Sequence, residues 1–166
     1  MKTLLIVRHA KSSWDNADMS DIDRPLNDRG KRDAPVMAQR VVKTGVRIDR
    51  FVSSPAKRAR QTAEFFVKAF GRKENEIVFI PELYHASMPT FKEVVGGLDN
   101  ADGTVALFSH NPGITAFVNI LTEVRLDNMP TCGVFAVKSP AKQWSEFLSA
   151  GPQLLFFDYP KAGLHD

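Results

Sequence analysis

The feature that most constrains the fold is an alternation, over the first 120 residues, between short apolar runs and longer segments with a helical spacing of apolar residues. Short apolar runs predict buried strands, and apolar residues that recur every three or four positions predict helices. The predicted strands span residues 3–7, 49–54, 77–80 and 104–108. The predicted helices span about residues 27–43, 55–70, 91–98 and 114–121. Strands that alternate with helices are typical of a mostly parallel sheet with helices on both faces, so we expect an α/β three-layer sandwich.

The last 35 residues break this alternation. They contain three further candidate strands, at residues 132–137, 144–147 and 154–157. Strands that follow one another without helices usually pair antiparallel, so we expect an antiparallel C-terminal addition at one edge of the sheet. The sequence has no linker, internal repeat or low-complexity segment, and we predict one domain over residues 1–166.

The helix predicted at residues 27–43 contains a proline. Asn27 or Asp28 can cap its first turn, and Gly45 follows its end. Pro35 has no N–H to donate and therefore disfavours a helix interior. We expect Pro35 to lie in the first turn, or the helix to begin later.

The composition indicates an ordinary globular protein, with 43% hydrophobic and 25% charged residues. Its formal net charge of +3 is too small to indicate a nucleic-acid-binding surface, but it suits a pocket that attracts an anion. Arg8 and His9 cut the first apolar run too short for a secretion signal, and no stretch approaches a membrane span. We expect a cytoplasmic protein, monomeric by default, without nucleic-acid or membrane partners. Cys132 is the only cysteine, which excludes an internal disulfide.

Candidate functional residues follow three of the predicted strands. Arg8 and His9 follow the first strand, Arg58 lies shortly after the second, and His110 follows the fourth. In an open parallel sheet, ligands bind outside the carboxyl ends of the strands. We therefore expect these side chains to meet at one edge of the sheet.

This set of residues suits phosphoryl transfer. A phosphoryl group in transfer spreads negative charge over its oxygens, and the planar arginine side chain meets two of those oxygens at once. A neutral imidazole can act as the nucleophile, and a second imidazole can donate a hydrogen bond or move a proton. The sequence has no Cys-x5-Arg signature, glycine-rich phosphate loop or clustered metal ligands. We therefore predict a histidine nucleophile with an arginine clamp, without a metal or cofactor.

Four blocks of the sequence resemble, in order, the signature blocks of the histidine phosphatase (phosphoglycerate mutase-like) superfamily. They are residues 4–12, 23–30, 53–62 and 109–112. The first block carries Arg-His-Ala in place of the family's Arg-His-Gly, and it looks like the opening of the compact SixA-type phosphohistidine phosphatases. The blocks are collinear and span nearly the whole chain.

The resemblance implies a role for each matching residue. His9 would be the nucleophile that becomes phosphorylated, and water would then restore it in a second step. Arg8 and Arg58 would bind the phosphoryl oxygens together with Arg24, and His110 would complete the pocket. The arginines favour the neutral form of His9 because a nearby like charge disfavours imidazolium. We expect the second ring nitrogen of His9 to donate to a backbone carbonyl.

The substrate depends on how the leaving group is protonated. An alkoxide leaving group needs a placed acid, for which Glu82 and His85 are the candidates, although neither lies in a matching motif. A phosphoramidate has a weaker bond and depends less on such an acid. A phosphohistidine-bearing protein is therefore the predicted substrate, and the short chain, without long insertions, favours the same choice. A broad phosphomonoesterase acting on small phosphate esters, or a non-catalytic phosphate-binding module, are the alternatives.

Some of these residues have a second interpretation. Arg24 is either a phosphate ligand or a loop residue paired with Asp21 or Asp23. Lys11 is typical of a surface lysine. Trp14 lines the mouth of the pocket or anchors a loop. His165 lies in a tail that we predict to be disordered.

Overall fold

The computed structural model of the chain describes residues 1–162, so the predicted disorder around His165 lies outside the described residues. Its centre is a six-stranded sheet with the order β3-β2-β4-β1-β5-β6. The strands are β1 (Lys2–Arg8), β2 (Arg50–Ser53), β3 (Ile77–Phe79), β4 (Thr104–Ser109), β5 (Val134–Ser139) and β6 (Gln153–Asp158).

The pairing of the strands confirms the predicted mixed sheet. Strands β3, β2, β4 and β1 pair in parallel, whereas β5 pairs antiparallel with β1 and β6 pairs antiparallel with β5. The register of β1 and β4 places Arg8 opposite Ser109, so the residues that follow the two strands leave the sheet side by side.

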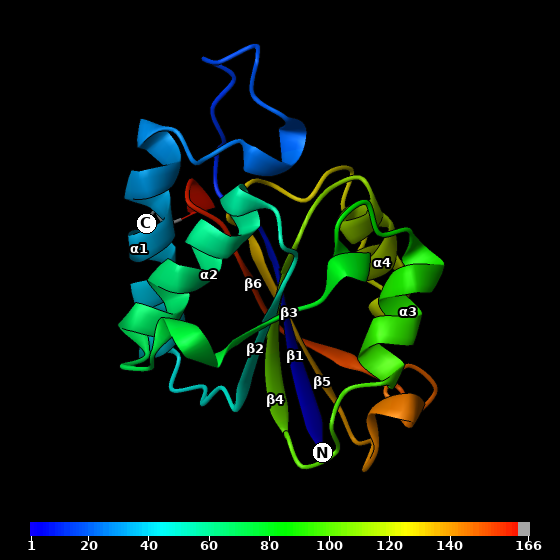
Figure 1. Cartoon of the computed structure of the whole chain (residues 1–166). Coiled ribbons are helices and arrows are strands. Elements are labelled where there is room, and N and C mark those ends of the chain that lie inside the picture. Colours follow the sequence, from blue (N-terminus) through cyan, green and yellow to red (C-terminus); the bar gives the residue numbers. More distant parts are fainter. Residues whose placement is uncertain (163–166) are drawn as a thin grey trace.

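Four helices cover the two faces of this sheet (Figure 1). Helices α1 (Asp28–Lys43) and α2 (Lys57–Ala69) lie on one face, and α3 (Met88–Gly96) and α4 (Gly113–Leu121) lie on the other. The described residues also contain short 3-10 helices, which are η1 (Asp21–Asp23), η2 (Glu74–Glu76), η3 (Pro81–Leu83) and η4 (Trp144–Glu146). The arrangement is the predicted three-layer α/β sandwich.

The prediction of a strand at residues 144–147 is wrong, because this segment contains η4. Trp144 and Phe147 are both buried and their rings stack at 5.3 Å between centroids. Residues three apart would point to opposite faces of a strand but share one face of a helix. Packing both rings against the same core therefore requires a helical turn.

Helix α1 also differs from its prediction. Its N-cap is Asn27, whose side chain accepts a hydrogen bond of 2.9 Å from the N–H of Gly30. Pro35 lies inside the helix, beyond the first turn, and the helix does not begin later. The carbonyl of Lys31, which loses its intrahelical donor to the proline, belongs to an exposed residue and can be solvated.

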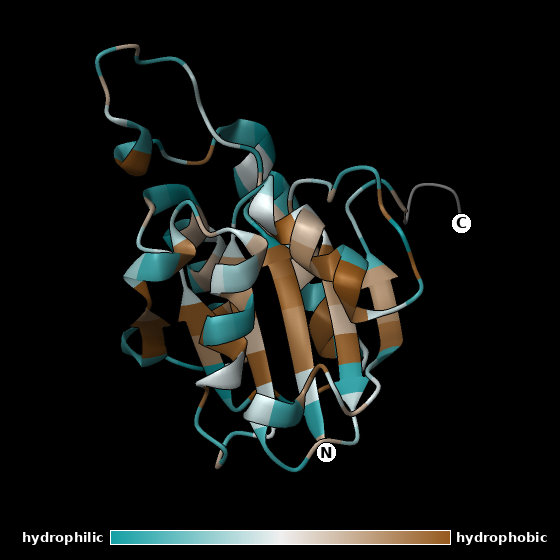
Figure 2. Cartoon of the chain, turned by 90° about the vertical axis from the view of Figure 1, so that its right-hand side faces the viewer, coloured by the Kyte–Doolittle hydropathy of each residue, from teal (hydrophilic) through white to brown (hydrophobic). Residues whose placement is uncertain are grey.

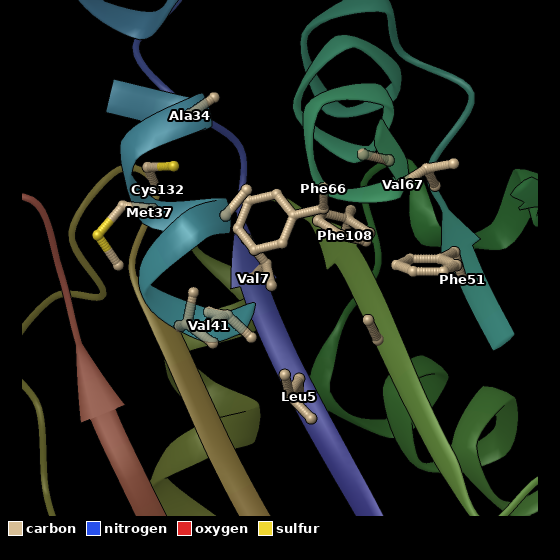
Figure 3. Packing of buried hydrophobic residues seen from close by; sticks show 14 of the residues in the cluster. Leu5, Val7, Ala34, Met37, Val41, Phe51, Phe66, Val67, Phe108 and Cys132 are labelled. Carbon is tan, nitrogen blue, oxygen red and sulfur yellow. The ribbon is translucent and has the colours of Figure 1, made fainter. Parts of the chain in front are cut away.

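The continuous apolar run of β1 is explained by burial on both faces of the sheet. Leu5 and Val7 belong to the core under α1 and α2, together with Phe66 of α2 (Figure 3). Leu4 and Ile6 belong to the core under α3 and α4. Successive side chains of a strand alternate between faces, so a strand covered on both sides is apolar at every position.

Apolar residues are accordingly concentrated in the strands, whereas the helices and loops carry much of the hydrophilic surface (Figure 2). In residues 1–162, no helix combines the length and apolarity that crossing a membrane requires.

Candidate active site

The residues predicted to converge do meet at the carboxyl ends of β1, β2 and β4. They line a pocket of about 240 Å³, here called the central pocket. Its lining consists of Arg8, His9, Lys11, Ser12, Trp14, Arg24, Arg58, His110, Asn111 and Thr131. The rings of His9 and His110 lie 5.2 Å apart between centroids. Both histidines are buried, as are Arg24 and Arg58.

His9 is held in one tautomer by the backbone. Its Nδ1 lies 2.7 Å from the carbonyl oxygen of Ala10. A carbonyl only accepts hydrogen bonds, so Nδ1 carries the proton and Nε2 keeps a free lone pair. Burial, with the charges of the nearby arginines, lowers the pKa of His9 to about 3. The imidazole is therefore neutral at physiological pH, as the sequence predicted.

His110, which follows β4, is held by a residue at the end of the neighbouring strand β2. Its Nε2 lies 2.7 Å from the hydroxyl oxygen of Ser54, which follows β2. Its Nδ1 is buried and has no hydrogen-bond partner within residues 1–162. Burial, and then the proximity of His9 and Arg58, lowers the pKa of His110 to about 2, so this ring is also neutral.

Three arginines place positive charge around the pocket. Arg8 donates from Nη1 to the carbonyl oxygen of Met129 at 2.7 Å, and its Nε is buried without a partner in the described part of the chain. Arg24 donates to the hydroxyl of Ser12 at 2.6 Å. Arg58 lies in the first turn of α2 and is buried. Guanidinium groups in this position suit an anionic ligand.

Asp21 of η1 joins two of these arginines, and sequence reasoning considered it only as a partner of Arg24. Its carboxylate accepts from Arg24 at 2.8 Å, from Arg58 at 3.0 Å and from the hydroxyl of Tyr84 at 2.5 Å. Burial acts to raise the pKa of Asp21, but the hydrogen bonds from Tyr84 and the two arginines outweigh it and hold the pKa well below its ordinary range. Asp21 is thus a permanent anion beside the pocket.

The predicted pairing of Arg24 with Asp21 is confirmed, whereas its role as a phosphate ligand stays a prediction. Arg24 lines the central pocket and also pairs with Asp21. Its guanidinium lies 3.3 Å from the centre of the Trp14 ring, which places this exposed aromatic side chain at the mouth of the pocket. Lys11 is exposed, as expected of a surface lysine, yet it lines the same pocket.

The backbone after His9 is fixed by close contacts with two helices. The N–H of Ala10 donates to the hydroxyl of Thr62 at 3.0 Å, and that hydroxyl donates to the carbonyl oxygen of Arg58 at 2.8 Å. On the other side, Gly30 approaches Lys11 so closely that an added Cβ would lie 2.2 Å from its carbonyl oxygen. Glycine is therefore required at this position because a side chain would collide with the Lys11 backbone. An unusual φ is not the reason, since the φ of Gly30 lies outside the left-handed region.

The two candidate acids do not line the central pocket. Glu82 lies in η3 and is exposed. The ring of His85 contacts that of Tyr84, with centroids 3.9 Å apart and the planes tilted by 38°. It lines a neighbouring cleft of about 420 Å³ that the central pocket meets at His110 and Asn111.

The arrangement supplies the parts needed for phosphoryl transfer. A neutral imidazole with a free lone pair faces an anion-binding pocket, and guanidinium groups surround it. Within residues 1–162, no group of three or more His, Cys, Asp or Glu side chains is placed so that it could hold a metal ion.

Comparison with known sequences supports this chemistry. The model of the histidine phosphatase superfamily, branch 1, matches residues 4–93, a segment that includes Arg8, His9 and Arg58. An uncharacterized chloroplastic protein of Arabidopsis thaliana is 29% identical over 160 residues, which cover 91% of this chain and 73% of that protein. An uncharacterized protein of Mycobacterium leprae is 29% identical over 168 residues, covering 93% of this chain and 100% of that protein.

Comparison with solved structures finds the same fold. A protein of Agrobacterium tumefaciens assigned as the phosphohistidine phosphatase SixA has a TM-score of 0.81 at 26% identity, over 96% of this chain and 98% of that one. The protein histidine phosphatase SixA in complex with tungstate has a TM-score of 0.80 at 24% identity, over 98% and 99% of the two chains. A mycobacterial glucosyl-3-phosphoglycerate phosphatase in complex with VO3 has a TM-score of 0.67 at 18% identity, over 96% and 100%. The last two likenesses concern the fold alone.

Proposed function

The chain belongs to the histidine phosphatase superfamily and is a phosphatase, and we propose that it hydrolyses phosphohistidine in proteins through a phosphorylated His9. The observation that carries the proposal is the hydrogen bond between His9 Nδ1 and the carbonyl of Ala10, which leaves Nε2 unprotonated in a pocket lined by arginines. A nucleophile with this tautomer reacts without first losing a proton.

In the first step, the phosphoryl group enters the central pocket and its oxygens accept hydrogen bonds from Arg8, Arg24 and Arg58. His9 Nε2 attacks the phosphorus in line, a new P–N bond forms, and the bond to the leaving group breaks. The guanidinium groups stabilise the negative charge on the transferring oxygens. The unpartnered Nε of Arg8 is a donor available for this task.

His110 is proposed to donate a hydrogen bond to the same oxygens. If the Ser54 hydroxyl donates to His110 Nε2, the proton of the neutral ring is on Nδ1. That atom is buried without a partner in the described residues, and a phosphoryl oxygen would supply one. In the second step, water attacks the phosphorus of phosphorylated His9 and releases phosphate.

The lack of a carboxylic acid among the residues that line the central pocket favours phosphohistidine as the substrate. Neither Asp nor Glu is among the residues that line the central pocket. The nearest carboxyl group in the network, Asp21, has a lowered pKa and so has no proton to give at neutral pH. A P–N bond depends less than a P–O bond on a dedicated acid, whereas an alkoxide would need Glu82 or His85 to approach.

The shape of the site supports a bulky substrate. The central pocket shares His110 and Asn111 with the cleft around His85, and it shares Arg8, Lys11 and Thr131 with a second cleft on its other side. A phosphorylated side chain that projects from a protein surface can enter between the two. We infer that the protein acts as a cytoplasmic monomer, in keeping with a single cysteine, Cys132, that is free and buried.

The test compares phosphate release from a phosphohistidine-bearing protein with release from an alkyl ester, glycerol 1-phosphate, whose alkoxide leaving group needs an acid. Release from the first substrate alone, abolished in His9→Ala, supports the proposal. Comparable release from both substrates favours a broad phosphomonoesterase, and a loss of ester hydrolysis in Glu82→Gln or His85→Ala then identifies the acid. Tight binding of the phosphoprotein without any release favours the non-catalytic binding module.

A further inference from the structure

A second basic cleft adjoins the central pocket. It has a volume of about 380 Å³ and is called the basic cleft below. Its lining consists of Arg8, Lys11, Arg29, Asn128, Pro130, Thr131, Tyr159, Pro160 and Lys161. Arg8, Lys11 and Thr131 belong to both cavities, so a ligand in the central pocket extends directly into this cleft.

All charged residues that line the basic cleft are positive. Four of its lining residues carry a positive charge, and no acidic residue lines it. Lys11 and Lys161 are both exposed, so their ammonium groups are accessible to a ligand. Arg29 pairs with Asp33 through Nε at 3.4 Å, which leaves both of its Nη groups for a ligand. Arg8, at the boundary of the two cavities, has a buried Nε without a partner among the described residues.

The cleft on the other side of the central pocket is different. Besides His85 and His110, its lining consists of uncharged residues, including Ala86, Met88 and Pro112. The environment of the reacting phosphoryl group is therefore asymmetric, with cations on one flank and an uncharged surface on the other.

We propose that the basic cleft binds a second anionic group of the substrate, with Arg29 and Lys161 as specificity-determining residues. This inference rests on the proposed function, because the first anion is the phosphoryl group held beside His9. The second anion is a carboxylate or a phosphate. In a phosphoprotein it is an acidic side chain near the phosphorylated residue, and in a small substrate it is a second phosphate.

The test uses matched substrate pairs. One pair is a phosphohistidine peptide flanked by glutamates and the same peptide flanked by glutamines. The other pair is 1,3-propanediol bisphosphate and the corresponding monophosphate. In the wild-type protein, the peptide with glutamates has the lower KM, and the bisphosphate binds with a lower Kd in calorimetry than the monophosphate does. In the double variant Arg29→Gln/Lys161→Gln, that preference falls about tenfold, because two partly exposed charge contacts are lost.

The controls separate this effect from damage to the site. Neither substituted residue lines the central pocket, so hydrolysis of the glutamine-flanked peptide, binding of the monophosphate and inhibition by tungstate stay unchanged. The double variant Arg47→Gln/Lys142→Gln removes the same charge from exposed positions outside the cleft and keeps the wild-type preference. The pair that shows the preference identifies the source of the second anion.

Two results would overturn the inference: a wild-type protein indifferent to the second anion in both pairs, or an Arg29→Gln/Lys161→Gln variant that keeps the full preference. Failure of the proposed function looks different. In that case the peptides are not hydrolysed at all, while the bisphosphate arm still reports on the basic cleft.

Discussion

The carboxylate of Asp21 lies 3.0 Å from the guanidinium of Arg58, and the backbone carbonyl of Asp21 accepts a second hydrogen bond from Arg58 at 2.7 Å. The same carboxylate accepts a hydrogen bond from Arg24. One residue of a short 3-10 helix thus orients two of the arginines that line the central pocket.

We predict that Asp21→Ala lowers kcat/KM about tenfold or more, since two charge-assisted hydrogen bonds that orient arginines are lost. Steady-state hydrolysis of the phosphohistidine substrate measures the effect. Asp23→Ala is the matched control, because Asp23 lies in the same 3-10 helix and its side chain bonds, within residues 1–162, only with the hydroxyl of Ser20. Equal activity of the two variants would show that Arg24 and Arg58 are held without Asp21.

Ser54 is expected to position His110 through the contact of 2.7 Å with Nε2. Ser54→Ala frees the ring, and we predict a fall in kcat of about tenfold with little change in KM. Ser54→Thr, which keeps the hydroxyl, restores most of kcat. Ser53→Ala is the control, since it deletes a neighbouring buried hydroxyl that, among the described residues, bonds only with the carbonyl of Ser54. A change in KM alone would contradict the positioning role.

The buried histidines make stability depend on pH. Their pKa values of about 3 and about 2 lie below the ordinary value of 6.5, so between pH 6.5 and about 3 the unfolded chain binds protons that the folded protein does not. The free energy of unfolding is therefore highest above pH 6.5. It falls as the pH is lowered, by up to about 1.4 kcal/mol per pH unit for each imidazole.

Denaturant unfolding at pH 7.5, 6 and 5 measures this slope. The variant His9→Gln/His110→Gln is expected to lose most of it, because glutamine does not titrate. If the variant keeps the wild-type slope of the free energy of unfolding against pH, groups other than His9 and His110 cause the pH dependence.

Gly30 is expected to tolerate no side chain. In Gly30→Ala the new Cβ meets the carbonyl oxygen of Lys11, a backbone atom that cannot swing away. We predict a loss of about 1–3 kcal/mol in the free energy of unfolding and a lower activity, because the loop after His9 must shift. Gly96→Ala is the control, since its Cβ would meet only Ser145 at 3.9 Å. Equal stability of both variants would contradict the close contact.

The convergence of His9, Arg58 and His110 was predictable from the sequence. Each follows a short apolar run, and the carboxyl ends of parallel strands share one edge whatever the order of the strands. The neutral, singly protonated His9 also followed from its neighbours. The identity of the accepting carbonyl did not, because Ala10 is selected by the path of the chain beyond β1.

The role of Asp21 was not predictable in the same way. Its contacts reach Arg58, 37 residues away, and Tyr84, 63 residues away. They depend on how a loop without regular periodicity folds back over the strand ends. The basic cleft could not be predicted from the sequence for a similar reason, since Arg29 lies in α1 and Lys161 lies in the segment after β6. Local patterns predict elements, but they do not predict which exposed side chains of distant elements become neighbours.

The most direct test of the central claim is a rapid-quench experiment followed by intact-mass analysis of the protein during turnover of a phosphohistidine-bearing protein. We predict that wild-type protein carries one acid-labile phosphoryl group on His9, and that His9→Gln carries none and releases no phosphate. Turnover by His9→Gln, or a phosphoryl group found on His110 instead, would contradict it.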